Sequence, residues 1–544
     1  MIHNLIISVI LFFISKSNAK FTQLDFLKIN NSQIKNNYGN GNCVYLRGTN
    51  IGNLFVQENW MSSTNAKDQK TINEILTNRF GKETKEKLIK YYENNYFTLQ
   101  DLDKIKEIGM SVIRVPFTYM NLYDKENNEY QLKKNGFEKL DWIVEEASKR
   151  GIYIILDLHG AFGSQNGQDH SGELIENVKD VTFYSNDELK NLTLKLWKEV
   201  AIHYKNNPGV AGYDILNEPG EKAGMTFSYH WDFYNEIYKV IRSIDNDHII
   251  IMESCWTFLN LPNPKKYNWE NVMYEFHNYI WPFEKSSLLQ IIVNKLIIQT
   301  IKFAQFNVPI FIGEFTFFEQ NDAWKQILEL FNLNGYHYTS WSYKTNNMGS
   351  WGIYNQKGKE KIILENSTLK EIENIWSYNN IGTGNKSSND MVYNRMIEAM
   401  PGTVYFLNKN IQDKDYVSFK SAVIEKFVCA DDFGESNLIA NKNSIGNCAQ
   451  FIIYNNNDGT ISIQARANNK FLSIIHDSYN NETLINAKIN SIQDCGKFYI
   501  EKLKDNKVAL QSYINHNYIQ VNPYDKKLYV LSEKIDSWEE FYMV

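Results

Sequence analysis

The sequence predicts an α/β protein made of a (β/α)8 TIM barrel followed by a second, all-β domain of the β-trefoil type. Three observations lead to this prediction. From residue 43 to about 344, eight short apolar runs alternate with amphipathic helical patterns. Beyond residue 390 the pattern changes to short strands separated by Asn, Asp and Gly turns, and it repeats three times. The segment 379–390, rich in Asn, Gly and Ser, has the composition of a flexible linker between the two regions.

The eight predicted strands are nearly continuous in apolar residues, as expected of parallel strands that are covered on both faces. They are Cys43–Ile51, Ser111–Phe117, Ile152–Leu158, Val210–Leu216, His248–Glu253, Val272–Phe276, Val308–Ile312 and Tyr336–Trp341. Between them, Phe137–Arg150 and Phe233–Ile244 carry apolar residues at helical spacing, and Gly151 follows the first as a helix stop. Eight strands that alternate with helices favour a closed barrel. An open, doubly wound sheet is the alternative, but no Gly-x-Gly-x-x-Gly phosphate turn follows the first strands.

Two glutamates stand at the ends of predicted strands. Glu218 follows the run 210–216 after Asn217, and Glu314 follows the run 308–312 after Gly313. An unpaired carboxylate is costly to bury, so two such strand ends indicate one shared polar site. Paired carboxylates are what cleavage of a glycosidic bond requires, because one protonates the leaving oxygen and the other attacks or stabilises the anomeric carbon. The alternative is two unrelated surface glutamates.

A barrel builds its active site at the C-terminal ends of its strands. Polar and aromatic residues gather at this end of the predicted strands. They are Arg114, His159, Asn217, Glu218, His277, Tyr279, Glu314 and Trp341. Each alone could be a satisfied core residue, but together they indicate a site.

Length and composition predict two globular domains. At 544 residues the chain is too long for one ordinary core, and it is 43% apolar and 22% charged. The net charge of −6 without a polybasic block argues against nucleic acid or an anionic membrane as a partner. Residues 1–19 are typical of a secretory signal, and no later run approaches 18 uninterrupted apolar residues. We therefore expect a secreted or lumenal protein, glycosylated at Asn-x-Ser/Thr sites, with no transmembrane segment.

The all-β region contains three copies of one pattern. Val417–Ser421, Ile461–Ala465 and Val508–Ser512 lie 44 and 47 residues apart, and an aromatic residue follows the start of each by ten positions. Three such units predict a trefoil. The chain has five cysteines and no Cys-x-x-Cys or His-rich cluster, so we expect no zinc site. Cys448 and Cys495 occupy equivalent positions in different repeats, which favours buried small apolar residues over a disulfide.

The barrel region resembles glycoside hydrolase family 5, and within it the fungal-type exo-β-1,3-glucanases. The resemblance covers roughly residues 40–360, and its most specific piece is residues 157–167, Asp-Leu-His-Gly-Ala-Phe-Gly-Ser-Gln-Asn-Gly. Residues 46–52 and 58–60 resemble the opening strand and loop of the same subgroup. The chain departs from the subgroup at Gln168, where an aromatic is expected, and at His170, where asparagine is usual. Trp281 and Phe283 are candidates for a replacement stacking ring at the pocket mouth.

The resemblance implies a double displacement that retains the anomeric configuration and needs neither a metal nor an organic cofactor. Glu218 would be the acid/base, Glu314 the nucleophile, and Asn217 the partner of the sugar 2-hydroxyl. A guanidinium beside Glu314 would keep it ionised, and that charge would raise the proton affinity of Glu218. The remaining residues implied to bind substrate or orient the nucleophile are Glu58, Arg114, His159, Asn166, His277, Tyr279 and Trp341.

The expected activity is release of glucose from β-glucans by a monomer whose catalytic domain spans residues 20–378. Alternatives within the family are a β-glucosidase that acts on short or lipid-linked glucosides, an endo-β-glucanase and a mannanase. A non-catalytic carbohydrate-binding protein and a cytoskeletal cross-linker are alternatives from other classes. The second of these comes from the fascin-like character of residues 391–544, which lack the Gln-x-Trp signature of ricin-type lectins. This region either binds polysaccharide or packs against the barrel.

Overall fold

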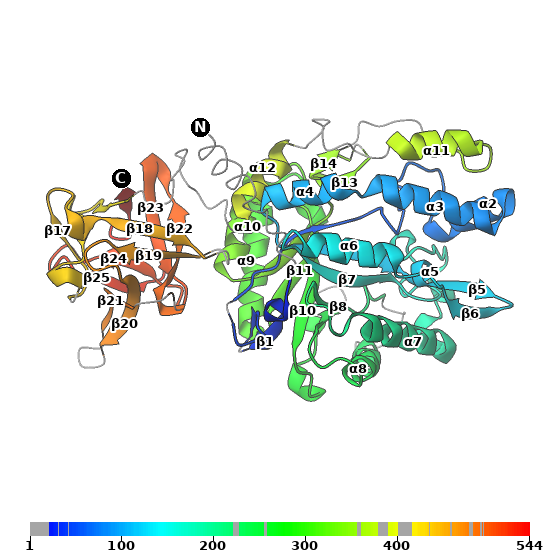
Figure 1. Cartoon of the computed structure of the whole chain (residues 1–544), viewed down its shortest axis with the longest axis horizontal. Helices are drawn as coiled ribbons and strands as arrows, with labels where there is room; N and C mark the ends of the chain where they lie inside the picture. Colours follow the sequence, from blue (N-terminus) through cyan, green and yellow to red (C-terminus); the bar gives the residue numbers. More distant parts are fainter. Residues whose placement is uncertain are drawn as a thin grey trace, which may run out of the picture. The chain divides into compact units, whose positions relative to one another are not determined.

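The computed structural model describes residues 21–30, 32–41, 43–220, 228–254, 258–346, 348–355, 361–378, 390–400, 416–434, 436–456, 460–477, 482–489, 492 and 494–544. The chain forms two compact units, which divide between Ile397 and Glu398 (Figure 1). The predicted signal segment 1–19 and the linker residues 379–389 lie outside the described residues.

The first unit contains a closed barrel of eight described parallel strands. They follow one another around the barrel in chain order, and the last pairs with the first. The strands are β3 (Arg47–Asn50), β4 (Val112–Thr118), β7 (Tyr153–Gly160), β8 (Val210–Asp214), β9 (Ile249–Glu253), β10 (Val272–Asn278), β11 (Ile310–Phe315) and β12 (His337–Ser340). Each overlaps one predicted strand, so the (β/α)8 prediction is confirmed.

Helices surround the barrel strands on the outside (Figure 1). Those of the first unit are α2 (Gln69–Phe80), α3 (Lys82–Tyr96), α4 (Leu99–Ile108), α5 (Tyr119–Leu122), α6 (Glu138–Ser148), α7 (Asp187–Tyr204), α8 (Ser228–Arg242), α9 (Ser287–Ala304), α10 (Asn321–Leu333), α11 (Leu369–Tyr378) and α12 (Asp390–Ala399). The predicted helix stop Gly151 follows α6 with a positive φ of 69°, a conformation that glycine adopts at little cost. Asn186 caps α7 by accepting hydrogen bonds from the backbone N–H groups of Glu188 and Leu189.

The N-terminal end of the barrel is apolar and closed. A short hairpin, β1 (Lys28–Asn30) and β2 (Gln33–Lys35), contributes Leu27 and Ile34 to a buried cluster with Leu46, Val112 and Phe311 of the barrel region. Two further strand pairs, β5 (Tyr123–Glu126) with β6 (Glu129–Leu132) and β13 (Lys344–Thr345) with β14 (Tyr354–Asn355), lie outside the barrel sheet. Apolar side chains fill this end of the barrel. The polar residues of the strands lie toward the opposite end.

One glycine makes room for a buried carboxylate inside the barrel. A Cβ atom at Gly313 of β11 would lie 1.5 Å from Glu275 Oε1 on the neighbouring strand β10. Glu275 is fully buried. Glycine at position 313 is therefore needed for two acidic side chains, Glu275 and Glu314, to share the upper part of the barrel.

The second unit is an antiparallel, barrel-like all-β region, as predicted. Its described strands are β15 (Phe419–Ser421), β16 (Phe427–Cys429), β17 (Ile439–Lys442), β18 (Phe451–Asn455), β19 (Ile461–Ala465), β20 (Phe471–Asp477), β21 (Glu482–Ile489), β22 (Lys497–Lys502), β23 (Lys507–Ser512), β24 (Tyr518–Val521), β25 (Leu528–Ser532) and β26 (Phe541–Met543). The strands fall into three groups of four, β15 to β18, β19 to β22 and β23 to β26. The first three strands of each group pair in order, as β15–β16–β17, β19–β20–β21 and β23–β24–β25. The fourth strand of each group pairs with the first strand of the next, as β18–β19, β22–β23 and β26–β15. The trefoil itself stays a prediction.

The all-β region begins later than the predicted residue 391. Residues 390–399 form helix α12, and the chain up to Ile397 belongs to the first unit. Val392, Met396 and Met400 recur at helical spacing and are buried, and the ring of Tyr393 contacts that of Tyr354 in the first unit. The sequence prediction missed this apolar face because a linker-like segment precedes it.

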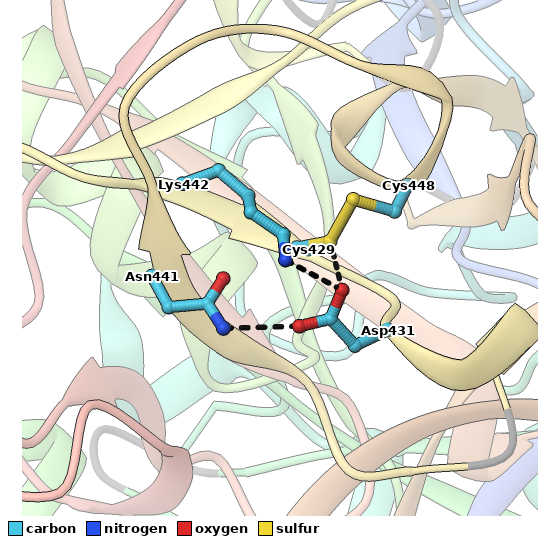
Figure 2. The surroundings of a disulfide bond; sticks show 5 residues. All are labelled: Cys429, Asp431, Asn441, Lys442 and Cys448. Atoms are coloured by element: carbon cyan, nitrogen blue, oxygen red, sulfur yellow. Dashed lines mark hydrogen bonds and ion pairs between the residues drawn. A yellow bond between two sulfur atoms is a disulfide. The ribbon is translucent and has the colours of Figure 1, made fainter.

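The prediction for Cys448 was wrong. Cys448, in a short 3-10 turn, forms a disulfide with Cys429 of β16, and their Cα atoms are 4.9 Å apart (Figure 2). Cys495 is half-buried. Asp431 lies beside the disulfide, where it pairs with Lys442 at 3.0 Å and accepts a hydrogen bond from Asn441 at 3.0 Å. Comparing equivalent cysteines between repeats overlooked a partner 19 residues away within the same repeat.

Helix α9 is the one described helix that is long and apolar enough, by length and composition, to cross a membrane. Of its 18-residue window, 28% is buried. The buried positions include Ile291, Asn294, Ile298 and Ile301, which form one face. The sequence showed no uninterrupted apolar run of this length because Gln290, Asn294, Lys295 and Lys302 interrupt it.

Opening the disulfide should destabilise the second unit alone. A cross-link over 19 residues contributes about 3 kcal/mol, mainly by restricting the unfolded chain. In C429S/C448S, calorimetry should show a lower melting temperature for the second unit and an unchanged transition for the first. C495S is the matched control because it removes a thiol from the same unit without opening the bond. Equal shifts of both transitions would contradict independent units.

Candidate active site

A cavity of about 460 Å³ opens at the C-terminal ends of the barrel strands. Its lining combines carboxylates, histidines and tryptophans. The lining residues are Glu58, Trp60, His159, His170, Asn217, Glu218, Tyr279, Trp281, Glu314, Trp341, Met348 and Trp351. Seven of these were predicted as site residues from the sequence, and they come from segments far apart in the chain.

Glu218 and Glu314 face each other in this cavity. One carboxylate oxygen of each and one ring nitrogen of His277 all lie within 4.8 Å of one another. Glu314 belongs to β11, whereas Glu218 lies four residues beyond the end of β8 in a backbone conformation with φ of 39°. That conformation is unfavourable for a residue with a side chain. The carboxylate of Glu253 stabilises it by accepting the backbone N–H of Glu218 at 2.5 Å.

Arg114, on β4, connects the two carboxylate-bearing strand ends. Its Nη1 donates to Glu314 Oε1 at 2.9 Å, its Nη2 donates to Asn217 Oδ1 at 2.8 Å, and its Nε donates to Asp214 Oδ2 at 2.8 Å. The side chain is fully buried. Burial opposes its charge, but the carboxylates around it outweigh that cost and raise the pKa of the guanidinium further. A permanent positive charge therefore faces Glu314.

Tyr279 and His277 complete the surroundings of the two glutamates. The hydroxyl of Tyr279 donates to Glu314 Oε2 at 2.8 Å. Burial and the neighbouring Glu314 raise the pKa of Tyr279, so the hydroxyl keeps its proton and remains a donor. His277 Nδ1 is 2.7 Å from Glu218 Oε1 and 3.4 Å from Glu314 Oε2. Burial disfavours charge on His277, but the surrounding carboxylates raise its pKa and make it an imidazolium.

His159, Trp341 and Glu58 form another part of the lining. His159 Nδ1 bonds to Asp157 Oδ2 at 2.7 Å, and burial lowers the pKa of His159 to about 3. The ring is therefore neutral. Trp341 stacks on this ring with centroids 5.5 Å apart. Glu58 accepts a hydrogen bond from Trp60 Nε1 at 2.6 Å, and burial raises the pKa of its carboxyl to about 8.

Two buried polar atoms of the lining residues have no hydrogen-bond partner within the described part of the chain. They are Asn217 Nδ2, whose Oδ1 is occupied by Arg114, and Glu58 Oε1. Buried polar groups normally find partners, so unfilled donors and acceptors in a cavity indicate a polar ligand. Together with the exposed indole faces, they suit a sugar ring and its hydroxyl groups.

The family assignment follows from sequence similarity over the barrel. The sequence model of Cellulase (glycosyl hydrolase family 5) matches residues 64–347, more than half of the chain. The chain belongs to glycosyl hydrolase family 5. The predicted family membership is thereby confirmed.

Three relatives carry names of different specificity. A "Beta-xylosidase" of Phanerodontia chrysosporium is 32% identical over 257 residues, which cover 47% of this chain and 52% of the relative. A "Probable glucan 1,3-beta-glucosidase A" of Aspergillus fumigatus is 28% identical over 238 residues, covering 43% and 55%. A "Probable glucan endo-1,6-beta-glucosidase B" of Aspergillus terreus is 27% identical over 254 residues, covering 43% and 61%. The chain spans about half the length of the curated relatives it matches.

Two sequence-based expectations for this family 5 site differ from the structure. Asn166, expected to bind substrate, does not line the cavity, and its amide instead donates to the backbone carbonyl of Glu218 at 3.0 Å. Glu218 was expected to have a raised proton affinity because of Glu314. Desolvation does act in that direction, but His170 and His277 outweigh it and hold the pKa of Glu218 well below its usual range. The expectation considered the charge of Glu314 but not the charges of His170 and His277.

The sequence analysis also missed several residues of the site. Asp157, Asp214, Glu253 and Glu275 are buried carboxylates around Arg114 and His277. The sequence signal that could have identified these four residues is an acidic residue inside an otherwise apolar strand run. His170 lines the cavity and contacts Glu218 at 3.1 Å, although the sequence marked it only as a departure from the subgroup. Of the two proposed stacking rings, Trp281 lines the cavity and Phe283 does not.

Met348 and Trp351 follow the last barrel strand in the chain. They reach the mouth of the cavity only in the folded protein. The ring of Trp351 lies 5.3 Å from that of Trp60 and 5.4 Å from that of Trp281. No spacing or motif in the sequence connects these positions. The site thus has an aromatic mouth above a charged floor.

Within the site, two groups of described residues hold metal-ligating atoms within 4.8 Å of one another: Glu218, His277 and Glu314, and Glu253, Glu275 and His277. His277 belongs to both. Its imidazolium charge, with the guanidinium of Arg114 beside it, opposes a cation at either place. These donor sets fit proton chemistry better than metal binding.

Glu58 should make the folded state less stable as the pH rises. Its carboxyl has a pKa of about 8 when folded and near 4.5 when unfolded, so the folded state keeps a proton that the unfolded state loses between these values. E58Q should therefore be more stable than the wild type by an amount that grows from pH 5 to pH 8. The upper limit is about 1.4 kcal/mol per pH unit.

Thermal unfolding at several pH values measures this difference. The exposed-face variant E86Q on α3 is the matched control and should follow the wild type throughout. A stability difference between E58Q and wild type that stays constant with pH would contradict the raised pKa of Glu58.

Proposed function

We propose that this chain is a retaining β-glycosidase that releases single glucose units from β-glucans, most specifically an exo-acting β-1,3-glucosidase. The observation that carries the proposal is the approach of Glu218 and Glu314, with one oxygen of each within 4.8 Å. Retaining glycosidases hold their two carboxyl groups about 5 Å apart, because the nucleophile attacks the sugar directly. Inverting enzymes need a wider gap, roughly 6.5–9.5 Å, to hold a water molecule.

The surroundings of the two glutamates support separate roles. Arg114 and Tyr279 donate to different oxygens of Glu314, which favours its ionised form and aims it as a nucleophile. Glu314 attacks the anomeric carbon while Glu218 gives a proton to the leaving oxygen, and the glycosidic bond breaks. Glu218 then takes a proton from water, whose oxygen attacks the glycosyl ester and frees Glu314.

Asn217 supports the same reaction from the sugar side. Its Oδ1 is fixed by Arg114, and its Nδ2 has no hydrogen-bond partner among the described residues. Because Asn217 lines the cavity, we infer that this Nδ2 donates to the bound sugar. A hydroxyl next to the anomeric carbon meets such a donor, and hydrogen bonds of this kind strengthen as the transition state forms. We assign this contact to the sugar 2-hydroxyl.

We infer exo action from a junction between two segments that contribute residues to the cavity lining. The segment that carries Glu58 and Trp60 is joined to the loop after β7, since Asp68 accepts the backbone N–H of Leu174 at 2.8 Å. The backbone N–H of Lys70 also donates to the carbonyl of Gly172 at 2.9 Å. We infer that this junction closes one end of the cavity, so that the site admits the terminus of a glucan chain and excludes a continuous strand.

Substrate class, second unit and location are further parts of the proposal. The names of the three relatives support a β-linked substrate and leave xylose, β-1,3- and β-1,6-linked glucose as alternatives that an assay separates. We propose polysaccharide binding for the second unit. None of its described residues lines the cavity. The disulfide between Cys429 and Cys448 supports secretion, because such bonds persist in oxidising compartments.

Replacing the two glutamates should give distinguishable defects. E314A should form no glycosyl-enzyme and should be rescued by azide with inversion. E218A should still be glycosylated by 2,4-dinitrophenyl β-glucoside, because that leaving group needs little protonation, while losing about 10²–10⁴-fold on substrates with poor leaving groups. Rates on both substrate types and the stereochemistry of the products by NMR measure the effect. Identical responses of the two variants would contradict the assigned roles.

The products of a long β-1,3-glucan should be glucose alone from the earliest times, because only a chain end fits the closed cavity. Chromatography of the digest, run beside β-1,6-glucan, β-1,4-glucan, mannan and aryl β-xyloside, identifies both linkage and sugar. A ladder of oligosaccharides would show endo action. Cleavage of the xyloside in preference to the glucoside would show a β-xylosidase.

A further inference from the structure

His170 contacts the carboxyl group that we assign as acid/base, and the double displacement described above does not use it. Its Nε2 lies 3.1 Å from Glu218 Oε2, whereas His277 Nδ1 lies 2.7 Å from Glu218 Oε1. The two histidines therefore occupy different oxygens of one carboxyl group. His170 stands where the resembling subgroup carries asparagine, a residue that cannot hold an acidic proton.

The amide of Asn166 determines what His170 Nε2 meets on its other side. Asn166 Oδ1 accepts the backbone N–H of Gln168 at 3.0 Å, and its Nδ2 donates to the carbonyl of Glu218 at 3.0 Å. These two bonds assign the NH2 end of the amide. That same Nδ2 is 2.8 Å from His170 Nε2. A neutral Nε2 accepts from this amide, while a protonated Nε2 faces a second donor and is disfavoured.

The carboxylates act in the opposite direction. Burial opposes a charge on His170, but Glu218, Glu58 and Glu314 outweigh it and raise its pKa to about 9. The titratable groups around His170 are Glu58, His159, Asp169, Glu218 and Glu314. His159 is neutral, so the charged neighbours from the other strands are acidic. The carboxylates thus favour a proton on His170, whereas the amide of Asn166 favours its transfer away, so the two partners act on His170 Nε2 in opposite directions.

We propose that His170 and Glu218 share one proton, which His170 Nε2 stores in the resting enzyme and Glu218 Oε2 delivers to the leaving oxygen. The proposal rests on the proposed function, because the stored proton has this use only if Glu218 is the acid/base. His170 is a positioning residue in this scheme, since it acts through Glu218 and touches no reacting bond.

The proton count closes over one turnover. In glycosylation the proton moves from His170 Nε2 to Glu218 Oε2 and on to the departing oxygen, leaving a neutral imidazole and an ionised carboxylate. In deglycosylation Glu218 removes a proton from the attacking water, the ester to Glu314 breaks, and the proton returns to His170. Each cycle loses one proton from the pair and regains one, so no other acid is needed.

The loop that carries His170 is fixed to the turn that carries Glu218. Gln165 Nε2 donates to the carbonyl of Asn217 at 2.8 Å, and the hydroxyls of Ser164 and Ser171 are 2.5 Å apart across the loop. Ser171 Oγ also donates to the carbonyl of Gln168 at 2.7 Å. These bonds hold the Nε2–Oε2 contact in place. Storage of the proton on His170 extends the pH range over which a proton is available for the leaving oxygen. Glu218 alone is a weak proton acceptor, because His170 and His277 lie beside its carboxyl group.

The decisive variants are H170Q and H170N, which place an amide near Glu218 that cannot store an acidic proton. For both, kcat/KM on aryl glucosides with poor leaving groups should fall about tenfold or more, while 2,4-dinitrophenyl β-glucoside should change less than about twofold. The alkaline limb of the pH profile should move down by about one pH unit or more, because Glu218 then holds the proton alone. H203Q is the matched control, since His203 pairs with Asp141 at 2.8 Å on the protein surface.

A second measurement does not depend on activity. In ¹⁵N-histidine-labelled protein, the ring signal that disappears in H170Q should titrate near pH 9 in the wild type and closer to the ordinary ~6.5 in E218Q. An unmoved alkaline limb, equal losses on both leaving groups, or the same titration in E218Q and wild type would overturn the proposal. If the wild type cleaves no glycoside, the proposed function fails, and the NMR titration still decides whether the proton is shared.

Discussion

The barrel mouth depends on one buried guanidinium. Arg114 lies among carboxylates from several strands, with Asp157, Asp214, Glu275 and Glu314 within 3.5 Å. These acids are nearly or fully buried. Without Arg114, their negative charges would repel one another and would stay uncompensated in a medium of low polarity. The guanidinium suits this place because it is planar and offers several donors in fixed directions. It connects the strand ends and donates to Glu314, the carboxylate that we propose as the nucleophile.

The position of Glu218 follows from a second layer around this centre. Its left-handed backbone is costly, and it persists because the surrounding groups over-determine it. Glu253 accepts its N–H, Asn166 donates to its carbonyl, and Gln165 donates to the preceding carbonyl of Asn217. The side chain of Glu218 is 34% exposed, whereas that of Glu314 is 7% exposed. The proposed acid/base is thus nearer to solvent than the proposed nucleophile.

Above the charged floor, the mouth is aromatic. Trp60, Trp281 and Trp351 come from three different loops and have ring centroids 5.3–5.4 Å apart in the pairs Trp60–Trp351 and Trp281–Trp351. Trp281 is 55% exposed, so its ring is accessible to a ligand at the mouth. Flat apolar faces above hydrogen-bonding groups match the two kinds of surface on a sugar, its C–H faces and its hydroxyl rim.

The sequence by itself determined the barrel, the all-β second region, and the pair Glu218 and Glu314. These follow from local patterns: apolar periodicity defines strands and helices, and a glutamate beside a buried strand is recognisable without knowledge of its neighbours. The helix at 390–399 was just as local, yet the linker-like segment before it hid its periodicity. The disulfide partner of Cys448, the cluster of buried acids, the role of Asn166 and the aromatic mouth required the tertiary structure. So did the sign of the electrostatic effect on Glu218, because it depends on His170 and His277, which lie 48 and 59 residues away in the chain. Electrostatic interactions act through space, and only folding sets the distances between side chains that are remote in sequence.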